Sequence, residues 1–151
     1  MRISTAVVTG AASGIGLALS TRLSAGGAHV VMADVDREAL TARAADLGAT
    51  ATPVVADLTD PVAVHALADT AFARLGHVDL LVNNAGVVGP VGVPVWEVDP
   101  EQVRRVLDVN FWSHLHVARA FVPRLLAQGR PAHIVQTASM SASVVSARSA
   151  A

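Results

Sequence analysis

The stretch Val-Val-Thr-Gly-Ala-Ala-Ser-Gly-Ile-Gly-Leu at residues 7–17 decides how this chain folds. Its β-branched start predicts the end of a buried strand, and its last residues predict the first turn of a helix. Glycine occupies positions 10, 14 and 16, where we expect a side chain to stand in the way of the turn or of a ligand. Because the start of a helix attracts anions, the stretch predicts a site for a pyrophosphate group.

The surroundings of these glycines favour this interpretation. Their spacing, G-x-x-x-G-x-G, differs from the G-x-G-x-x-G of many dinucleotide sites, and a glycine turn without a ligand is the alternative. A second apolar run follows the predicted helix, however, and it ends at Asp34, eighteen positions after Gly16. An acidic residue at about this distance commonly binds the ribose hydroxyls of a dinucleotide.

Composition limits the remaining classes of protein. The 151 residues suffice for one domain with a buried core. The formal net charge of −1 gives no attraction to nucleic acid or to an anionic membrane, and no apolar run is long enough to span a bilayer. The chain has no cysteine, and its six histidines lack the spacing of metal ligands. We therefore expect a cytoplasmic protein without a metal site and without a nucleic-acid or membrane partner.

Apolar runs and helical patterns alternate along the chain. Strands are expected at Thr5–Val8, His29–Ala33, Pro53–Ala56, Val78–Val82 and His133–Gln136. Helices are expected at Gly14–Ala25, from the Asp36 cap to Leu47, at Pro61–Leu75 and from the Asp99 cap to Gln128. We expect Pro123 to bend or interrupt the last helix and Trp96 to anchor the loop before it. The alternation predicts an α/β fold with a doubly wound, mostly parallel sheet of about five strands.

Five polar or glycine-rich segments follow the ends of the predicted strands. They are residues 10–16, Asp34, Asp57, Asn83–Gly86 and Thr137–Ser139. Because parallel strands place their carboxyl ends on one edge of a sheet, we expect these segments to converge there and to form the ligand site.

Taken together, these segments resemble the short-chain dehydrogenase/reductase family. The matching motifs are Thr9–Gly16, Asp34, Asp57, Asn83–Gly86, Val109–Phe111 and Ile134–Ser139, in the order and spacing of the family along essentially the whole chain. The resemblance implies a Rossmann-type domain over residues 1–139, followed by a loose Ser/Ala-rich tail over residues 140–151. It also implies that these residues lack the C-terminal strands and helices of the family.

The resemblance further implies a nicotinamide dinucleotide cofactor and assigns residues to it. These are Gly10, Ser13, Gly14, Ile15, Gly16, Asp34, Asp57, Leu58, Asn84, Ala85 and Gly86. Asp34 would accept hydrogen bonds from the adenosine ribose and would repel a 2′-phosphate, which favours NAD over NADP. Capping of the next helix is the alternative role for Asp57, and turn formation is the alternative for Asn84.

By the same resemblance, Ser139 would bind the oxygen of an alcohol or ketone substrate, and Asn110 would hold a water relay. Asn110 could instead bend a long helix, and Ser139 could be one of several serines in a flexible end. In the family, a Tyr about thirteen residues after the Ser transfers the proton, and a Lys lowers the pKa of that Tyr. The 151 residues contain no Tyr and no Lys, and all eleven basic residues are Arg.

The sequence leaves two hypotheses for function. The first is an NAD(P)-dependent oxidoreductase of alcohols and ketones, represented by a chain truncated before the Tyr-x-x-x-Lys motif. The alternative is a non-catalytic NAD-binding module, either a pseudoenzyme or an inactive fragment. A homo-oligomer is a further expectation, because the last predicted strand leaves an unpaired sheet edge.

Overall fold

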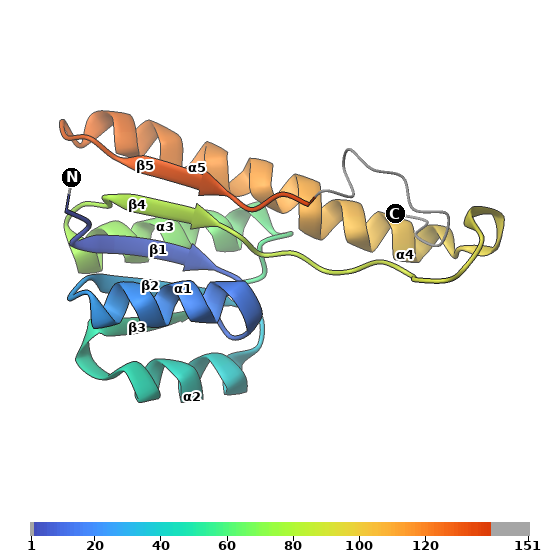
Figure 1. Cartoon of the computed structure of the whole chain (residues 1–151). Coiled ribbons are helices and arrows are strands. Elements are labelled where there is room, and N and C mark those ends of the chain that lie inside the picture. The colour runs from blue at the N-terminus through green and yellow to red at the C-terminus, as the bar shows by residue number, and fades with distance from the viewer. Residues whose placement is uncertain (1, 140–151) are drawn as a thin grey trace.

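Within residues 2–139, which the structure describes, the computed structural model contains five parallel strands in one sheet (Figure 1). The strands are β1 (Thr5–Thr9), β2 (His29–Asp34), β3 (Ala51–Val55), β4 (Leu80–Asn83) and β5 (His133–Gln136). Their order across the sheet is β3-β2-β1-β4-β5, so the chain builds outward from β1 first on one side and then on the other. The predicted doubly wound, Rossmann-type α/β fold is confirmed.

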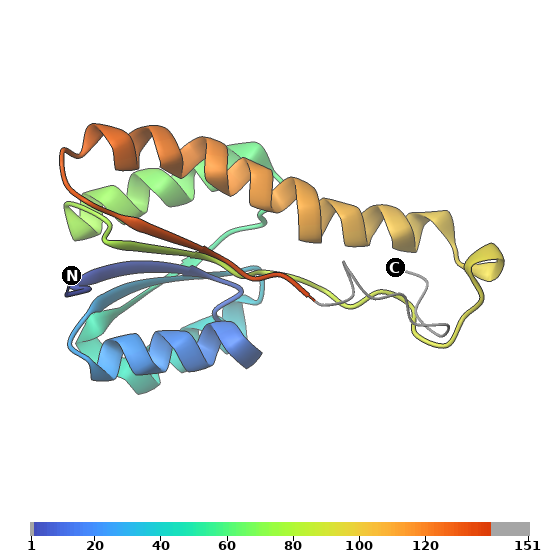
Figure 2. The ribbon, with the colours of Figure 1, turned by 45° about the horizontal axis from the view of Figure 1, so that its top comes forward.

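Helices cover both faces of the sheet (Figure 2). The helices α1 (Gly14–Ala25) and α2 (Arg37–Leu47) lie on one face, and α3 (Pro61–Leu75) and α5 (Ser113–Ala127) lie on the other. Helix α4 (Pro100–Leu107) extends past the carboxyl ends of the strands and joins α5 through a π-helical segment, Asp108–Trp112. Short 3-10 turns lie at Gly48–Thr50 and Val95–Glu97. None of the described helices is long and apolar enough to cross a membrane.

Successive residues of the central strands enter two separate hydrophobic cores. Val7 of β1 is buried with Phe121 on the face that α3 and α5 cover. The next residue, Val8, is buried with Met32 and Leu40 on the face that α1 and α2 cover. A strand covered on both faces has no exposed side, which explains the continuous apolar run of β1.

Two of the predicted strands begin at the wrong residue. All other first and last residues of the five strands lie within one residue of the prediction. β3 begins at Ala51 rather than at Pro53, because pairing with β2 begins there. Pro53 is tolerated inside β3 because this strand lies at the edge of the sheet. β4 begins at Leu80 rather than at Val78, whose N–H donates to the Gln128 side chain (3.1 Å) instead of to a strand.

The expected interruption of the helix at Pro123 and the expected anchoring role of Trp96 are also wrong. α5 continues through Pro123, because Phe121 and Leu125 are buried against the sheet and α3 on either side of it. The irregular part of the long helix lies instead at Asp108–Trp112. Trp96 is 81% exposed and packs into neither core of the described residues, because its loop runs beyond the carboxyl end of the sheet (Figure 1).

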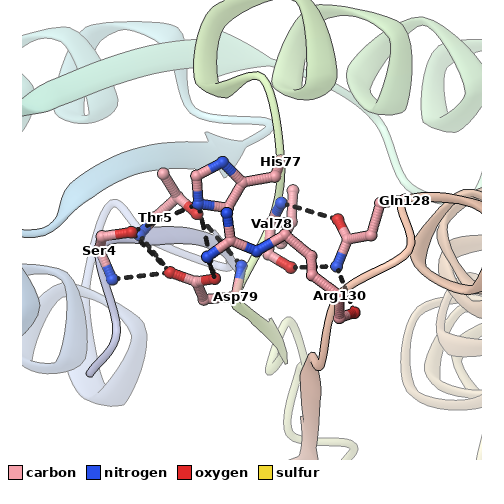
Figure 3. Close-up of polar contacts among 7 residues, drawn as sticks. All are labelled: Ser4, Thr5, His77, Val78, Asp79, Gln128 and Arg130. Carbon is pink, nitrogen blue, oxygen red and sulfur yellow. Dashed lines mark hydrogen bonds and ion pairs between the residues drawn. The ribbon is translucent and has the colours of Figure 1, made fainter. Parts of the chain in front are cut away.

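The buried carboxylate of Asp79 joins three strands at the amino end of the sheet (Figure 3). Its Oδ2 accepts hydrogen bonds from the Ser4 N–H (2.8 Å), the Ser4 hydroxyl (2.7 Å) and the Thr5 N–H (3.3 Å). Its Oδ1 lies 3.1 Å from a guanidinium nitrogen of Arg130 and 3.5 Å from His77 Nε2. Asp79 therefore ties together the segments that lead into β1, β4 and β5.

The protonation of Asp79 is linked to the stability of the fold. Burial by itself raises the pKa of the Asp79 carboxyl, because a charge loses hydration in the interior. The hydrogen bonds from Ser4, the attraction of His77 and the hydrogen bond from Thr5 outweigh burial and hold the pKa below its ordinary value of 3.8. Because the pKa is lower in the folded state, the carboxylate stabilises the fold at neutral pH, and this contribution is lost as the pH falls below 3.8.

Replacing Asp79 by Asn should lower the free energy of unfolding at neutral pH by about 3 kcal/mol, because the buried site loses its charge and one of its acceptors. The difference should shrink in acid, because the Asp79 carboxyl of the unfolded wild-type chain takes up a proton at a higher pH than that of the folded chain, and this favours unfolding. Urea denaturation at pH 7 and at about pH 3 measures both effects. Asp69→Asn removes an exposed ion pair with Arg124 and is the matched control, with an expected change below about 0.5 kcal/mol. Equal losses in the two variants would contradict the prediction.

Candidate functional site

A cleft of about 760 Å³ lies at the carboxyl ends of the strands. Ten of the eleven residues predicted to bind a cofactor line it: Gly10, Ser13, Gly14, Ile15, Asp34, Asp57, Leu58, Asn84, Ala85 and Gly86. The eleventh, Gly16, is buried behind the cleft and does not line it. The segments that follow the five strands therefore converge at the carboxyl edge of the sheet, as the sequence predicted.

The three glycines of the first turn meet three different needs. Gly10 has φ +65°, and a Cβ there would lie 2.9 Å from Ala85 Cα in the turn after β4. A Cβ on Gly16 would lie 2.0 Å from the carbonyl oxygen of Gly10. A Cβ on Gly14 would meet no described protein atom within 4 Å, so the turn itself would not obstruct a side chain there. Gly14 is required instead by its φ of +52°.

Asp34 is held in the cleft by the backbone around it. Its Oδ2 accepts a hydrogen bond from the Ala12 N–H (3.0 Å), in the glycine turn after β1. Its Oδ1 accepts one from the Asp36 N–H (3.1 Å) at the start of α2. These two bonds fix the carboxylate at the carboxyl end of β2, facing the glycine turn.

Asp57 shapes the turn after β3. Its Oδ1 accepts hydrogen bonds from the Thr59 N–H (2.9 Å) and the Thr59 hydroxyl (2.7 Å). Asp60, and not Asp57, caps α3 by accepting from the Val62 N–H (2.8 Å), so the alternative capping role of Asp57 is wrong. Leu58 is buried, and its carbonyl oxygen lies 3.3 Å from His116 Nδ1 on α5.

Asn84 locks the turn after β4 onto the end of β1. Its backbone N–H donates to the Thr9 hydroxyl (2.9 Å), and its side-chain Nδ2 donates to the Thr9 carbonyl oxygen (3.0 Å). Its Oδ1 accepts a hydrogen bond from the Thr137 hydroxyl (3.0 Å), just after β5. One amide thus joins the ends of β1, β4 and β5.

The two residues predicted to be catalytic lie outside the cleft lining. Asn110 lies in the π-helical segment, where its Oδ1 accepts from the Val87 N–H (2.8 Å) and its Nδ2 donates to the Val87 carbonyl oxygen (2.9 Å). Its side chain therefore binds the loop after β4 rather than its own helix. Ser139 is exposed and follows β5 at the same edge of the sheet.

Sequence reasoning missed His114 as a residue of this region. It lies on α5, is 9% exposed, and its Nε2 lies 2.6 Å from the carbonyl oxygen of Ala85. The signal was its spacing: His114 shares the buried face of α5 with Val117 and Phe121, three and seven residues further on. A polar residue on such a face needs a buried partner.

The fold and the cleft define a Rossmann-type α/β protein with a glycine turn, an acidic residue and an asparagine turn around one nucleotide-sized site. The family model described as short chain dehydrogenase matches residues 4–151, and the chain belongs to this family of oxidoreductases.

The comparisons with individual proteins cover nearly all of this chain. It is 63% identical over 150 residues to the 1-deoxy-11-beta-hydroxypentalenate dehydrogenase of Streptomyces avermitilis, a match that takes in 97% of this chain and 56% of the relative. The Streptomyces exfoliatus dehydrogenase of the same name is 66% identical over 149 residues, a match that covers 97% of this chain and 54% of the relative. The chain thus spans about half the length of the curated relatives it matches.

Solved structures give the same picture. A short-chain dehydrogenase/reductase from Burkholderia phymatum in complex with NAD matches with a TM-score of 0.92 and 38% identity, over 99% of this chain and 53% of that one. An NAD+-bound xylitol dehydrogenase matches with a TM-score of 0.87 and 34% identity, over 93% of this chain and 54% of the xylitol dehydrogenase.

Gly16→Ala should lower the free energy of unfolding by about 3 kcal/mol, because the new Cβ would lie 2.0 Å from backbone that must then move. Gly14→Ala, where the space is open and only the positive φ is strained, should cost about 1 kcal/mol. Chemical denaturation of the two variants measures the difference. A larger loss for Gly14→Ala would mean that the turn is not limited by the contact between Gly16 and Gly10.

Proposed function

We propose that this chain is the cofactor-binding part of an NAD-dependent oxidoreductase that transfers hydride between the nicotinamide and an alcohol or ketone. The observation that carries the proposal is the carboxylate of Asp34, held by the Ala12 and Asp36 N–H groups in a cleft that the glycine turn also lines. A fixed acceptor suits the two hydroxyls of an adenosine ribose and repels a 2′-phosphate. NADP is therefore the less favoured cofactor.

The residues around the cleft fit a dinucleotide on this structure's own geometry. Helix α1 begins at the cleft without an acidic residue in its first turn, so its N-terminal N–H groups and its dipole favour a pyrophosphate. The open space at Gly14 allows the phosphates to approach the backbone. We assign Asp57 and Leu58 to the adenine, and Asn84, Ala85 and Gly86 to the adenosine ribose. The bound nicotinamide would accept or supply the hydride.

We assign Ser139 to the substrate oxygen and Asn110 to a water relay near it. The bond pair between Asn110 and Val87 supports this role, because it fixes Asn110 beside the loop that leaves β4. Proton transfer needs a further acid or base, and the 151 residues contain no Tyr and no Lys. A polypeptide of these residues alone is therefore proposed to bind NAD with little turnover, which is the non-catalytic alternative.

The relatives support a substrate class and an assembly. The name 1-deoxy-11-beta-hydroxypentalenate denotes a carboxylate that carries a hydroxyl group, and we propose a hydroxylated carboxylate, or the corresponding ketone, as substrate. We further propose a cytoplasmic location and a homo-oligomer. The oligomer is supported by β5, which is an edge strand within residues 2–139 and leaves Ile134 and Val135 about half exposed there.

Calorimetric titration of the 151-residue chain should detect NAD binding, because ten of the eleven proposed contact residues already line one cleft. Oxidation of a hydroxycarboxylate with NAD should remain at least about 100-fold below an ordinary enzyme rate of about 10 per second, because the acid–base residues are missing. Absence of NAD binding would contradict the proposed function. Turnover at the ordinary rate would mean that other residues of the chain transfer the proton.

Asp34→Asn should weaken NAD binding about tenfold and bring the affinities for NAD and NADP close together, because it removes a charged acceptor and the repulsion of a 2′-phosphate. Titration with each cofactor measures the two affinities. Asp36→Asn is the matched control: Asp36 caps α2, Asn caps equally well, and Asp36 does not line the cleft. An unchanged preference for NAD in Asp34→Asn would contradict the assignment of Asp34.

A further inference from the structure

A chain of hydrogen bonds connects β4, β5 and α5 directly behind the turn after β4. Asn83 Nδ2 donates to the backbone carbonyl oxygen of His114 (3.0 Å) and to Gln136 Oε1 (3.2 Å). The other end of the Gln136 amide, Nε2, is hydrogen-bonded to His114 Nδ1. His114 Nε2 in turn lies 2.6 Å from the carbonyl oxygen of Ala85.

This chain of bonds allows one tautomer of His114. Asn83 donates to Gln136 Oε1, which orients the Gln136 amide so that its N–H faces His114 Nδ1. Nδ1 must then accept, and the ring proton must lie on Nε2. From Nε2 the proton is donated to the carbonyl oxygen of Ala85.

The bond to His114 also sets the direction of the next peptide group. The Ala85 N–H already donates to the Thr9 hydroxyl (3.1 Å), so Ala85 is held on both sides. In a trans peptide the carbonyl and the following N–H point in opposite directions, and residues 2–139 contain no cis peptide. When His114 draws the Ala85 carbonyl toward α5, the Gly86 N–H points away from α5. Within residues 2–139 this N–H has no hydrogen-bond partner, and Gly86 lines the cleft.

We propose that His114 is a positioning residue: in its Nε2–H tautomer it holds the Ala85–Gly86 peptide so that the Gly86 N–H is a hydrogen-bond donor to a ribose hydroxyl of the bound dinucleotide. The inference rests on the proposed function for the identity of the ligand. Gln136 supports His114 from β5, so the same bonds fix the strand that leads to Thr137 and Ser139. No metal or proton transfer is needed, because His114 acts only by donating one hydrogen bond and accepting another.

The first test is the tautomer of His114 in the ligand-free 151-residue chain. Nitrogen-15 spectra of the imidazole ring at neutral pH should show a protonated Nε2 and an unprotonated Nδ1. A proton on Nδ1, with or without one on Nε2, would overturn the inference. This measurement needs neither a variant nor NAD.

Two variants separate the two bonds of His114. In His114→Gln the side-chain nitrogen reaches the position of Nε2 and can still donate to Ala85, whereas in His114→Asn the shorter amide reaches only the position of Nδ1. NAD titration should find His114→Gln within about threefold of wild type and His114→Asn about tenfold weaker. The matched controls, His65→Gln and His65→Asn, change an exposed histidine of α3 and should both bind as wild type does. Equal weakening in His114→Gln and His114→Asn would mean that His114 only fills space, and would overturn the inference.

The Gly86 amide gives a readout that packing alone does not move. Its proton resonance should shift downfield when NAD is added to the wild type and to His114→Gln, and should shift much less in His114→Asn. An unmoved Gly86 resonance in NAD-saturated wild type would overturn the inference. If the wild-type chain binds no NAD at all, the proposed function fails, whereas the tautomer still decides the role of His114. If His114→Asn does not fold, the tautomer and the wild-type Gly86 shift decide it.

Discussion

The contact between the turn after β1 and the turn after β4 is the constraint on which the rest of the site depends. A Cβ on Gly10 would lie 2.9 Å from Ala85 Cα, so the two backbones touch with no side chain between them. Thr9 and Asn84 secure the contact with a bond from the Asn84 N–H to the Thr9 hydroxyl (2.9 Å) and one from the Asn84 amide to the Thr9 carbonyl (3.0 Å). Since β1 and β4 are the neighbours at which the order of strands reverses, this contact forms the floor of the crevice that such sheets leave open.

Buried polar groups hold β4 at both of its ends. Before β4 begins, Asp79 accepts hydrogen bonds from the N–H groups of Ser4 and Thr5, at the start of β1. At its last residue, Asn83 binds α5 and β5. The hydrophobic cores fix the distance between the layers but not the position of β4 along its own axis, because apolar contacts have no direction. The directional hydrogen bonds at both ends of β4 help to fix its position along that axis. They thereby also fix the position of the turn at residues 84–86, which follows β4 directly.

The sequence predicted the parts of the site that depend on neighbouring residues. The turn at residues 10–16, the caps Asp36 and Asp60 and the turn at residues 84–86 follow from local rules, and the strand order then brings them to one edge. The structure differs from the sequence prediction where contacts with elements far away in the sequence determine the local conformation. Pro123 predicts a break by a local rule, but the burial of Phe121 and Leu125 outweighs the loss of one helical hydrogen bond. Gln128 likewise draws Val78 out of the predicted strand.

The helical segment at residues 108–114 shows why the remaining contacts were beyond sequence reasoning. Asn110 binds the backbone of Val87, and His114, about one turn further on, binds the carbonyl of Ala85. Neither pairing can be read from spacing along the chain, because the loop is more than twenty residues away and the π-helical segment changes which side chains share a face. Once both bonds form, the helix sets the positions of Ala85 and Val87 at two points, and Gly86 between them is held without a side chain of its own. Because α5 packs into the core through Val117 and Phe121, the backbone of the cleft at residues 85–87 is anchored to the core through this helical segment.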